Sequence, residues 1–157
     1  MKMLLKKYEQ GPFVIKYRRD NGSETWMQAD QYFVLHDLSH FAIETMLQYK
    51  SAFMGMLNNG MHIKDFEHRE KRNKIKISEE AVNAENIANL FLMELQQGEL
   101  EDFNQTLRES FNPMKEQLNP VQLSPEQIDA VRNKFKQLVA EWNSTPPGGE
   151  MELEYHL

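Results

Sequence analysis

The last seven residues constrain the fold of this chain more than any other segment, because apolar and polar side chains alternate there. The apolar positions are Met151, Leu153, Tyr155 and Leu157, and glutamate or histidine occupies each position between them. An alternation with a period of two is typical of a β-strand with one buried face. A strand at the end of a chain needs a sheet to join, so its partner must lie elsewhere in the sequence.

The N-terminal part of the chain contains the only obvious host for this strand. Residues 12–28 have the pattern of a β-hairpin, in which Asn21 and Gly22 tolerate the positive φ angles of a tight turn. Residues 3–8 can pair beside the hairpin as a further strand. A basic hairpin suits the acidic C-terminal strand facing it. Its basic side chains are Lys16, Arg18 and Arg19.

Apolar residues recur every three or four positions between the two chain ends, which predicts about four helices. The expected helices cover 36–57, 79–97, a segment from about 99 to Pro113, and a segment from Ser124 to Pro146. The basic stretch 64–76 is expected to be a surface connection. We therefore predict an α+β fold, in which a small antiparallel sheet from the N-terminal hairpin and the C-terminal strand packs against about four helices. Residues 1–157 are expected to form a single domain.

Composition excludes several classes of function. The 157 residues include no cysteine, which excludes a disulfide framework, thiolate metal sites and a thiol nucleophile. The net charge of −6 argues against a nucleic-acid partner. No stretch has the apolar length of a signal peptide or a membrane helix. We expect a soluble, cytoplasmic protein of bacterial type that has no membrane partner.

The charges are unevenly distributed along the chain. Residues 1–76 contain 13 basic and 9 acidic side chains, whereas residues 77–157 contain 5 basic and 15 acidic ones. Such asymmetry can mark two binding surfaces. The interpretation that we favour is that the two halves neutralise each other across the folded domain.

One cluster, from His36 to Glu44, has the spacing of a functional site. On a helix, positions i, i+4 and i+8 advance by only ~40° each, so His36, His40 and Glu44 lie along one ridge. Imidazoles one turn apart can chelate a divalent ion, and a carboxylate can add an oxygen ligand. Asp37 lies off this ridge, where it can favour the helix N-terminus or orient an imidazole.

The match to the HExxH helix of zinc proteases fails at one position. That motif places a general-base glutamate directly after the first histidine, where this chain has Asp37, which is one methylene shorter. In addition, the first and third ridge positions start roughly 12 Å apart at 1.5 Å rise per residue, so one ion binds two of the three ligands more easily than all three. A remaining ligand is then expected from His62, Glu67, His68 or Glu94.

Two hypotheses remain open. In the first, His36, His40 and Glu44 hold a divalent metal such as zinc, Glu44 and Asp37 are the candidate catalytic residues, and an enzymatic role is left open. In the second, the protein is a non-catalytic structural or protein-interaction domain, which could act as a monomer or as a homodimer. The same cluster is then a buried polar network. No cofactor other than a metal is expected.

Three segments together resemble a family of small uncharacterised bacterial proteins. The segments are the HDLxHFxxE motif from His36 to Glu44, the stretch from Phe53 to Leu57 with its following Gly60, and the W…PPGG-strand ending from Trp142 to Leu157. The resemblance spans most of the chain. The family has no established activity, so the resemblance implies the fold outline and draws attention to the motif. A second similarity, to the HDxxH zinc motif of a ubiquinone-biosynthesis family, covers five residues only.

Overall fold

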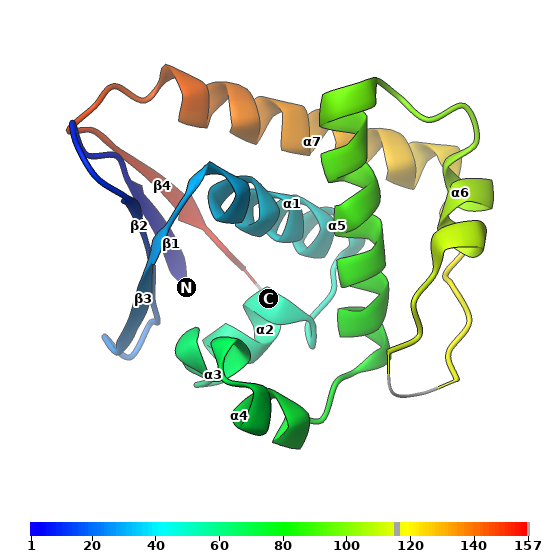
Figure 1. Cartoon of the computed structure of the whole chain (residues 1–157), viewed down its shortest axis with the longest axis horizontal. Coiled ribbons are helices and arrows are strands. Elements are labelled where there is room, and N and C mark those ends of the chain that lie inside the picture. The colour runs from blue at the N-terminus through cyan, green and yellow to red at the C-terminus, as the bar shows by residue number, and fades with distance from the viewer. Residues whose placement is uncertain (115–116, 157) are drawn as a thin grey trace.

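The structure is a computed structural model that describes residues 1–114 and 117–156. Within these residues, a four-stranded antiparallel sheet packs against helices, which confirms the predicted α+β class (Figure 1). The strand order is β3-β2-β1-β4. The strands are β1 (Lys2–Lys6), β2 (Phe13–Arg18), β3 (Glu24–Ala29) and β4 (Glu150–Glu154).

The two ends of the chain share this sheet, as the alternation predicted. The acidic strand β4, however, pairs with β1 and not with either strand of the basic hairpin. Leu5 lies opposite Met151, and an exposed ion pair of 2.5 Å joins Lys2 to Glu152 on the outer face. β1 can take this central place because its apolar residues are buried while its terminal lysines meet the acidic strand. Leu157, the last position of the predicted strand, lies outside the described residues.

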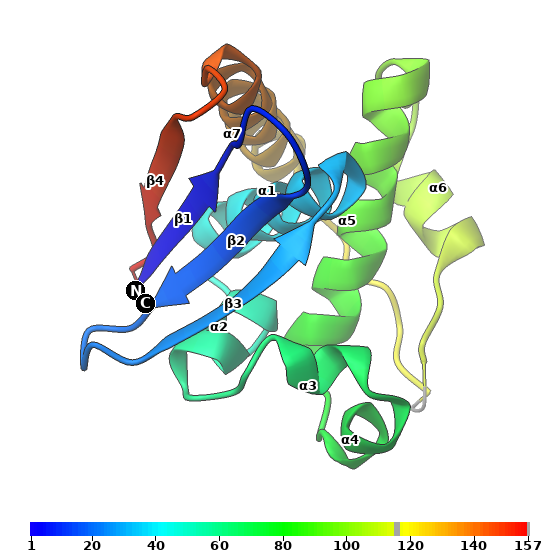
Figure 2. The same cartoon turned by 60° about the vertical axis from the view of Figure 1, so that its left-hand side comes forward.

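The helices cover one face of the sheet and leave the other face open (Figure 2). Met3, Leu5, Ile15 and Tyr17 are fully buried, and their register places them side by side on neighbouring strands. The turn between β2 and β3 includes Gly22 at a φ of 82°, as the hairpin pattern predicted.

Helix α1 occupies the centre of the molecule, packed against α5 and α7 (Figure 1). No helix in the described part of the chain is long and apolar enough to cross a membrane. The helices are α1 (Gln31–Leu47), α2 (Phe53–Asn58), α3 (Lys64–Glu67), α4 (Arg69–Lys74), α5 (Glu79–Gln97), α6 (Phe103–Ser110) and α7 (Pro125–Ser144).

The single helix predicted for residues 36–57 is two helices in the structure. α1 begins earlier because the Asp30 side chain caps it by accepting a hydrogen bond from the Phe33 N–H. It ends where Gln48 adopts the left-handed conformation, with a φ of 57°. The chain then turns and begins α2 at Phe53. The expected connection at 64–76 contains the short helices α3 and α4, neither of which has a buried residue.

The predicted start of the last helix is confirmed. Ser124 accepts a hydrogen bond from the Gln127 N–H, and the Gln127 side chain accepts one from the Ser124 N–H. This reciprocal capping box, followed by Pro125 in the first turn, fixes the N-terminus of α7. α7 buries Trp142, whose indole N–H donates to Gln31 at the start of α1. The two helices are therefore joined at this end.

Candidate functional site

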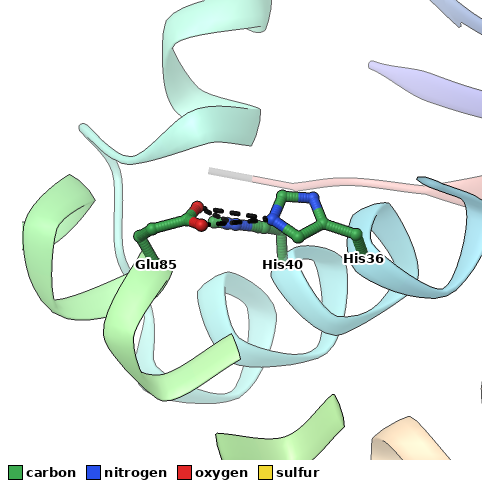
Figure 3. A group of neighbouring side chains, drawn as sticks. All are labelled: His36, His40 and Glu85. Atoms are coloured by element: carbon green, nitrogen blue, oxygen red, sulfur yellow. Dashed lines mark hydrogen bonds and ion pairs between the residues drawn. The ribbon is translucent and has the colours of Figure 1, made fainter. Parts of the chain in front are cut away.

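The two histidines of the motif lie one turn apart on α1, and both rings point toward Glu85 on α5 (Figure 3). The Nε2 atom of His40 lies 3.1 Å from Oε2 of Glu85, and Nε2 of His36 lies 3.4 Å from the same carboxylate. One ligand atom from each of the three side chains lies within 4.8 Å of the others. His36, His40 and Glu85 are therefore close enough to hold a metal ion.

Each imidazole has a second carboxylate behind it. Nδ1 of His36 lies 3.4 Å from Oδ1 of Asp37, and Nδ1 of His40 lies 3.4 Å from Oε1 of Glu44. The contact between His40 and Glu44 has the distance of an ion pair but does not have hydrogen-bond geometry. Both rings thus direct Nε2 to one shared carboxylate and Nδ1 to a carboxylate of their own.

The carboxylate of Asp37 connects α1 to the sheet. It is buried, and its Oδ2 accepts a 2.6 Å hydrogen bond from the hydroxyl of Tyr17 in β2. The Tyr17 ring in turn makes an edge-on contact with Phe53, which also contacts His40. Because all these side chains pack together, the orientation of the histidine pair depends on the sheet as well as on α1.

Glu44 connects α1 to the beginning of α2. Its side chain is 1% exposed, and it accepts hydrogen bonds from the N–H groups of Met54, at 2.9 Å, and Gly55, at 3.3 Å. A carboxylate is favourable at this position because the first N–H groups of a helix have no partner within the helix. Gly55 is required here, because a Cβ atom at this residue would lie 2.1 Å from the Lys50 carbonyl oxygen.

The arrangement of acids and imidazoles shifts the pKa values of both. Burial lowers the pKa of His40, but Glu44 and Glu85 outweigh burial and raise the pKa to about 10. The pKa of His36 is also raised, since Asp37 and Glu85 outweigh its burial. Burial favours the neutral form of Glu85, yet the two imidazoles hold its pKa well below the ordinary value. Without a metal, the site is therefore a carboxylate bridging two imidazoles that readily hold protons.

The three side chains line a pocket of about 620 Å³. His40 is 3% exposed and lies at its floor, whereas Arg72 of α4 is exposed and lies at its mouth. The wall between them is largely apolar. It includes Phe53, Met56, Phe66, Ile75 and Ile77.

The structure brings His36 and His40 together as the spacing predicted, but the group that completes the cluster is Glu85. The motif residues Glu44 and Asp37 lie on the Nδ1 side of the imidazoles, where each also binds a partner of its own. None of the four residues predicted to supply a remaining ligand joins the cluster. Glu94 instead pairs with Arg132, and the side chains of His62, Glu67 and His68 are exposed.

Sequence reasoning missed Glu85 because it is 45 residues from His40 and belongs to another helix. A signal was present in α5 itself. Ala81, four positions before Glu85, and Ala88, three positions after it, are small and buried. Positions three and four apart share a helix face, so Glu85 lies on the buried face of α5, where a carboxylate needs a partner.

Comparisons with protein-family models, with curated proteins and with solved structures find no match to this chain. The resemblance of the motif and its flanks to a bacterial family therefore stays a prediction.

Proposed function

We propose that the protein binds one divalent metal ion, such as Zn²⁺, through Nε2 of His36, Nε2 of His40 and the carboxylate of Glu85. The observation that carries this proposal is the convergence of the three ligand atoms within 4.8 Å, from two helices. Two imidazoles and a carboxylate form a donor set that suits zinc and other first-row divalent ions.

The groups behind the ligands support the proposal. Histidines that bind a metal usually direct the other ring nitrogen to a carboxylate or carbonyl, which fixes the ring and raises its basicity. Asp37 and Glu44 lie at these positions, 3.4 Å from the two Nδ1 atoms. The sequence predicted Glu44 as a metal ligand and Glu44 and Asp37 as catalytic residues. We propose instead that both residues orient the imidazoles.

The electrostatics of the site support a cation in the same way. Surroundings that raise the pKa of both imidazoles are surroundings of negative potential. One divalent ion would take the place of the two Nε2 protons and would bring the same total charge. Binding should therefore release protons, as it does wherever a metal displaces them from its ligands.

Three protein ligands leave a coordination position for water or a substrate, as in catalytic zinc sites. The ligands line a pocket, so this position is expected to face it. A metal bound here would lower the pKa of its water and polarise a carbonyl or phosphoryl oxygen. The proposed function is thus a metal centre of the catalytic type.

The test is a zinc titration of untagged protein that has been treated with a chelator. We expect one ion per chain, and we expect Glu85→Gln to weaken binding by at least about tenfold. The matched control is Glu79→Gln, which makes the same chemical change at an exposed residue of the same helix and should bind zinc like the wild type.

Two outcomes would overturn the proposal: binding well below one ion per chain, or equal binding by wild type and Glu85→Gln. Either outcome would favour the second hypothesis, in which the cluster is a buried polar network without a metal. Circular dichroism of each variant shows whether it is folded.

A further inference from the structure

The pocket above the histidine pair has the size of a small-molecule site. Its volume of about 620 Å³ lies within the roughly 300–1,000 Å³ that such sites occupy. Aromatic and aliphatic side chains form much of its lining, and the polar lining residues are His36, His40, Arg72, Asn73, Glu85 and Asn112. An occupant of complementary chemistry therefore has an apolar body and a polar end.

The charge at the mouth of the pocket favours an anion. Glu85 is the only acidic residue among the described lining residues, and both its oxygens face the imidazoles of His36 and His40. Arg72 is exposed at the mouth, and its guanidinium has no hydrogen-bond or ion-pair partner in the described part of the chain. The unmatched charge at the mouth of the pocket, that of Arg72, is therefore positive.

A second donor, the amide of Asn112, also lines the pocket and is exposed. The side-chain oxygen of Asn112 accepts a hydrogen bond from the Met114 N–H, which leaves the amide nitrogen of Asn112 without a partner among the described residues. A guanidinium and an amide together can donate to both oxygens of a carboxylate. Arg72 belongs to α4, which follows directly after α3 and contributes Arg72 to the pocket lining.

We propose that the pocket binds a small carboxylic acid with an apolar body. Arg72 and Asn112 hold the carboxylate at the mouth, and the apolar body lies against Phe53, Phe66 and Ile75. The opposite end of the molecule then reaches the floor, where the ion would be. This inference rests on the proposed metal site, since it names the kind of molecule that the metal would act on.

The experiment compares three probes by isothermal titration calorimetry with zinc-loaded protein. The probes are 4-phenylbutanoate, the uncharged 4-phenylbutan-1-ol, and acetate, which has the charge without the body. We expect only 4-phenylbutanoate to bind measurably below about 1 mM. Arg72→Gln should weaken this binding at least tenfold, whereas Arg69→Gln, an exposed arginine of α4 that does not line the pocket, should leave it unchanged.

The outcomes separate this inference from the metal proposal, because zinc content is measured in the same samples. If zinc binds and 4-phenylbutanoate does not, or if the alcohol binds equally well, the inference is overturned and the metal site stands. Binding that Arg72→Gln does not weaken would also overturn it, since the carboxylate would then occupy another place. If zinc itself does not bind, the metal proposal is overturned. The inference that one end of the carboxylic acid lies at a metal ion is then overturned as well.

Discussion

The hydroxyl of Tyr17 donates a 2.6 Å hydrogen bond to Oδ2 of Asp37, and this bond links the sheet to the helix that carries both histidines. Both side chains are buried. Burial, followed by the charge of Asp37, raises the pKa of Tyr17 well above its ordinary value, so the hydroxyl remains a donor at any physiological pH. The bond therefore persists across the pH range in which the histidine pair titrates.

Tyr17→Phe should destabilise the protein by about 1.5–3 kcal/mol, because a buried carboxylate loses a donor that water cannot replace. The edge-on contact of the ring with Phe53 is retained in this variant. Urea denaturation monitored by circular dichroism measures the change. Tyr32→Phe, at a residue that is 55% exposed, is the control and should stay within about 0.5 kcal/mol of wild type. Equal effects of the two substitutions would contradict the prediction.

Glu44→Gln should lower both stability and metal affinity. The amide keeps the shape of the side chain, but its hydrogen bonds with the N–H groups of Met54 and Gly55 lose their charge, at a cost of about 1–2 kcal/mol. Because the carboxylate also faces Nδ1 of His40, zinc affinity should fall about 10–100-fold.

The matched control for this variant is Glu80→Gln. Glu80 accepts hydrogen bonds from the N–H groups of Lys50 and Ser51 and does not line the pocket. Its substitution should reduce stability and leave zinc affinity unchanged. A zinc affinity that is equal in Glu44→Gln and wild type would show that Glu44 serves α2 alone.

Gly55→Ala should be strongly destabilising, because its Cβ would lie 2.1 Å from the Lys50 carbonyl oxygen and the backbone would have to move. We expect a loss of about 3 kcal/mol, at the upper end of the overpacking range. Thermal unfolding measures it. Gly11→Ala is the comparison: a Cβ there has open space, so only the cost of its positive φ, about 1–2 kcal/mol, is expected. The prediction fails if the two variants lose the same stability.

His40 should make the stability of the metal-free protein depend on pH. Burial lowers its pKa, and Glu44 and Glu85 raise it to about 10, above the ordinary value of 6.5. A raised pKa means that the protonated imidazole stabilises the folded state fully below pH 6.5, and that this contribution is lost as the pH rises toward 10. The free energy of unfolding, measured with a chelator present, should fall over this window.

His40→Gln is the control for the pH dependence, since a glutamine cannot titrate. The difference in unfolding free energy between wild type and this variant should shrink from pH 6.5 to pH 10. A difference that stays constant over this range would show that His40 does not hold a proton in the folded protein.

Ser124→Ala should cost about 1 kcal/mol, because it removes one half of the capping box at the start of α7. Urea denaturation measures the loss. Ser144→Ala, at the other end of the same helix, is the comparison, since its hydroxyl only returns a bond to the Ala140 carbonyl and should matter little. A Ser124→Ala variant as stable as wild type would contradict the assigned cap.

Sequence patterns predicted the features of the fold that depend on neighbouring residues. The capping box at Ser124 and the turn at Gly22 are set by side chains within a few positions, and both are present in the structure. The alternation of Met151 and Leu153 with glutamates likewise showed which face of the last strand is buried. These features need no knowledge of the rest of the molecule.

Features that depend on tertiary contacts were not predictable in the same way. A glutamine such as Gln48 gives no sequence signal for the left-handed conformation that ends α1. The apolar pattern of α1 also continues into α2, so the break between the two helices could not be predicted. Similarly, the spacing of His36 and His40 indicated a site, but Glu85 joins them only because α5 crosses α1. A motif within one helix specifies the ligands of that helix and does not specify the ligand from another.

The pairing of β1 with β4 has a consequence for how the chain folds. Lys2 lies opposite Glu154 in this pairing, so closing the sheet brings together residues that almost the whole chain separates. Loop-closure entropy opposes such contacts, and chains rich in them fold slowly. During synthesis on the ribosome, the apolar edge of β1 stays unpaired until residues 150–154 emerge. The nascent chain is therefore expected to be most prone to aggregation just before translation of this segment is complete.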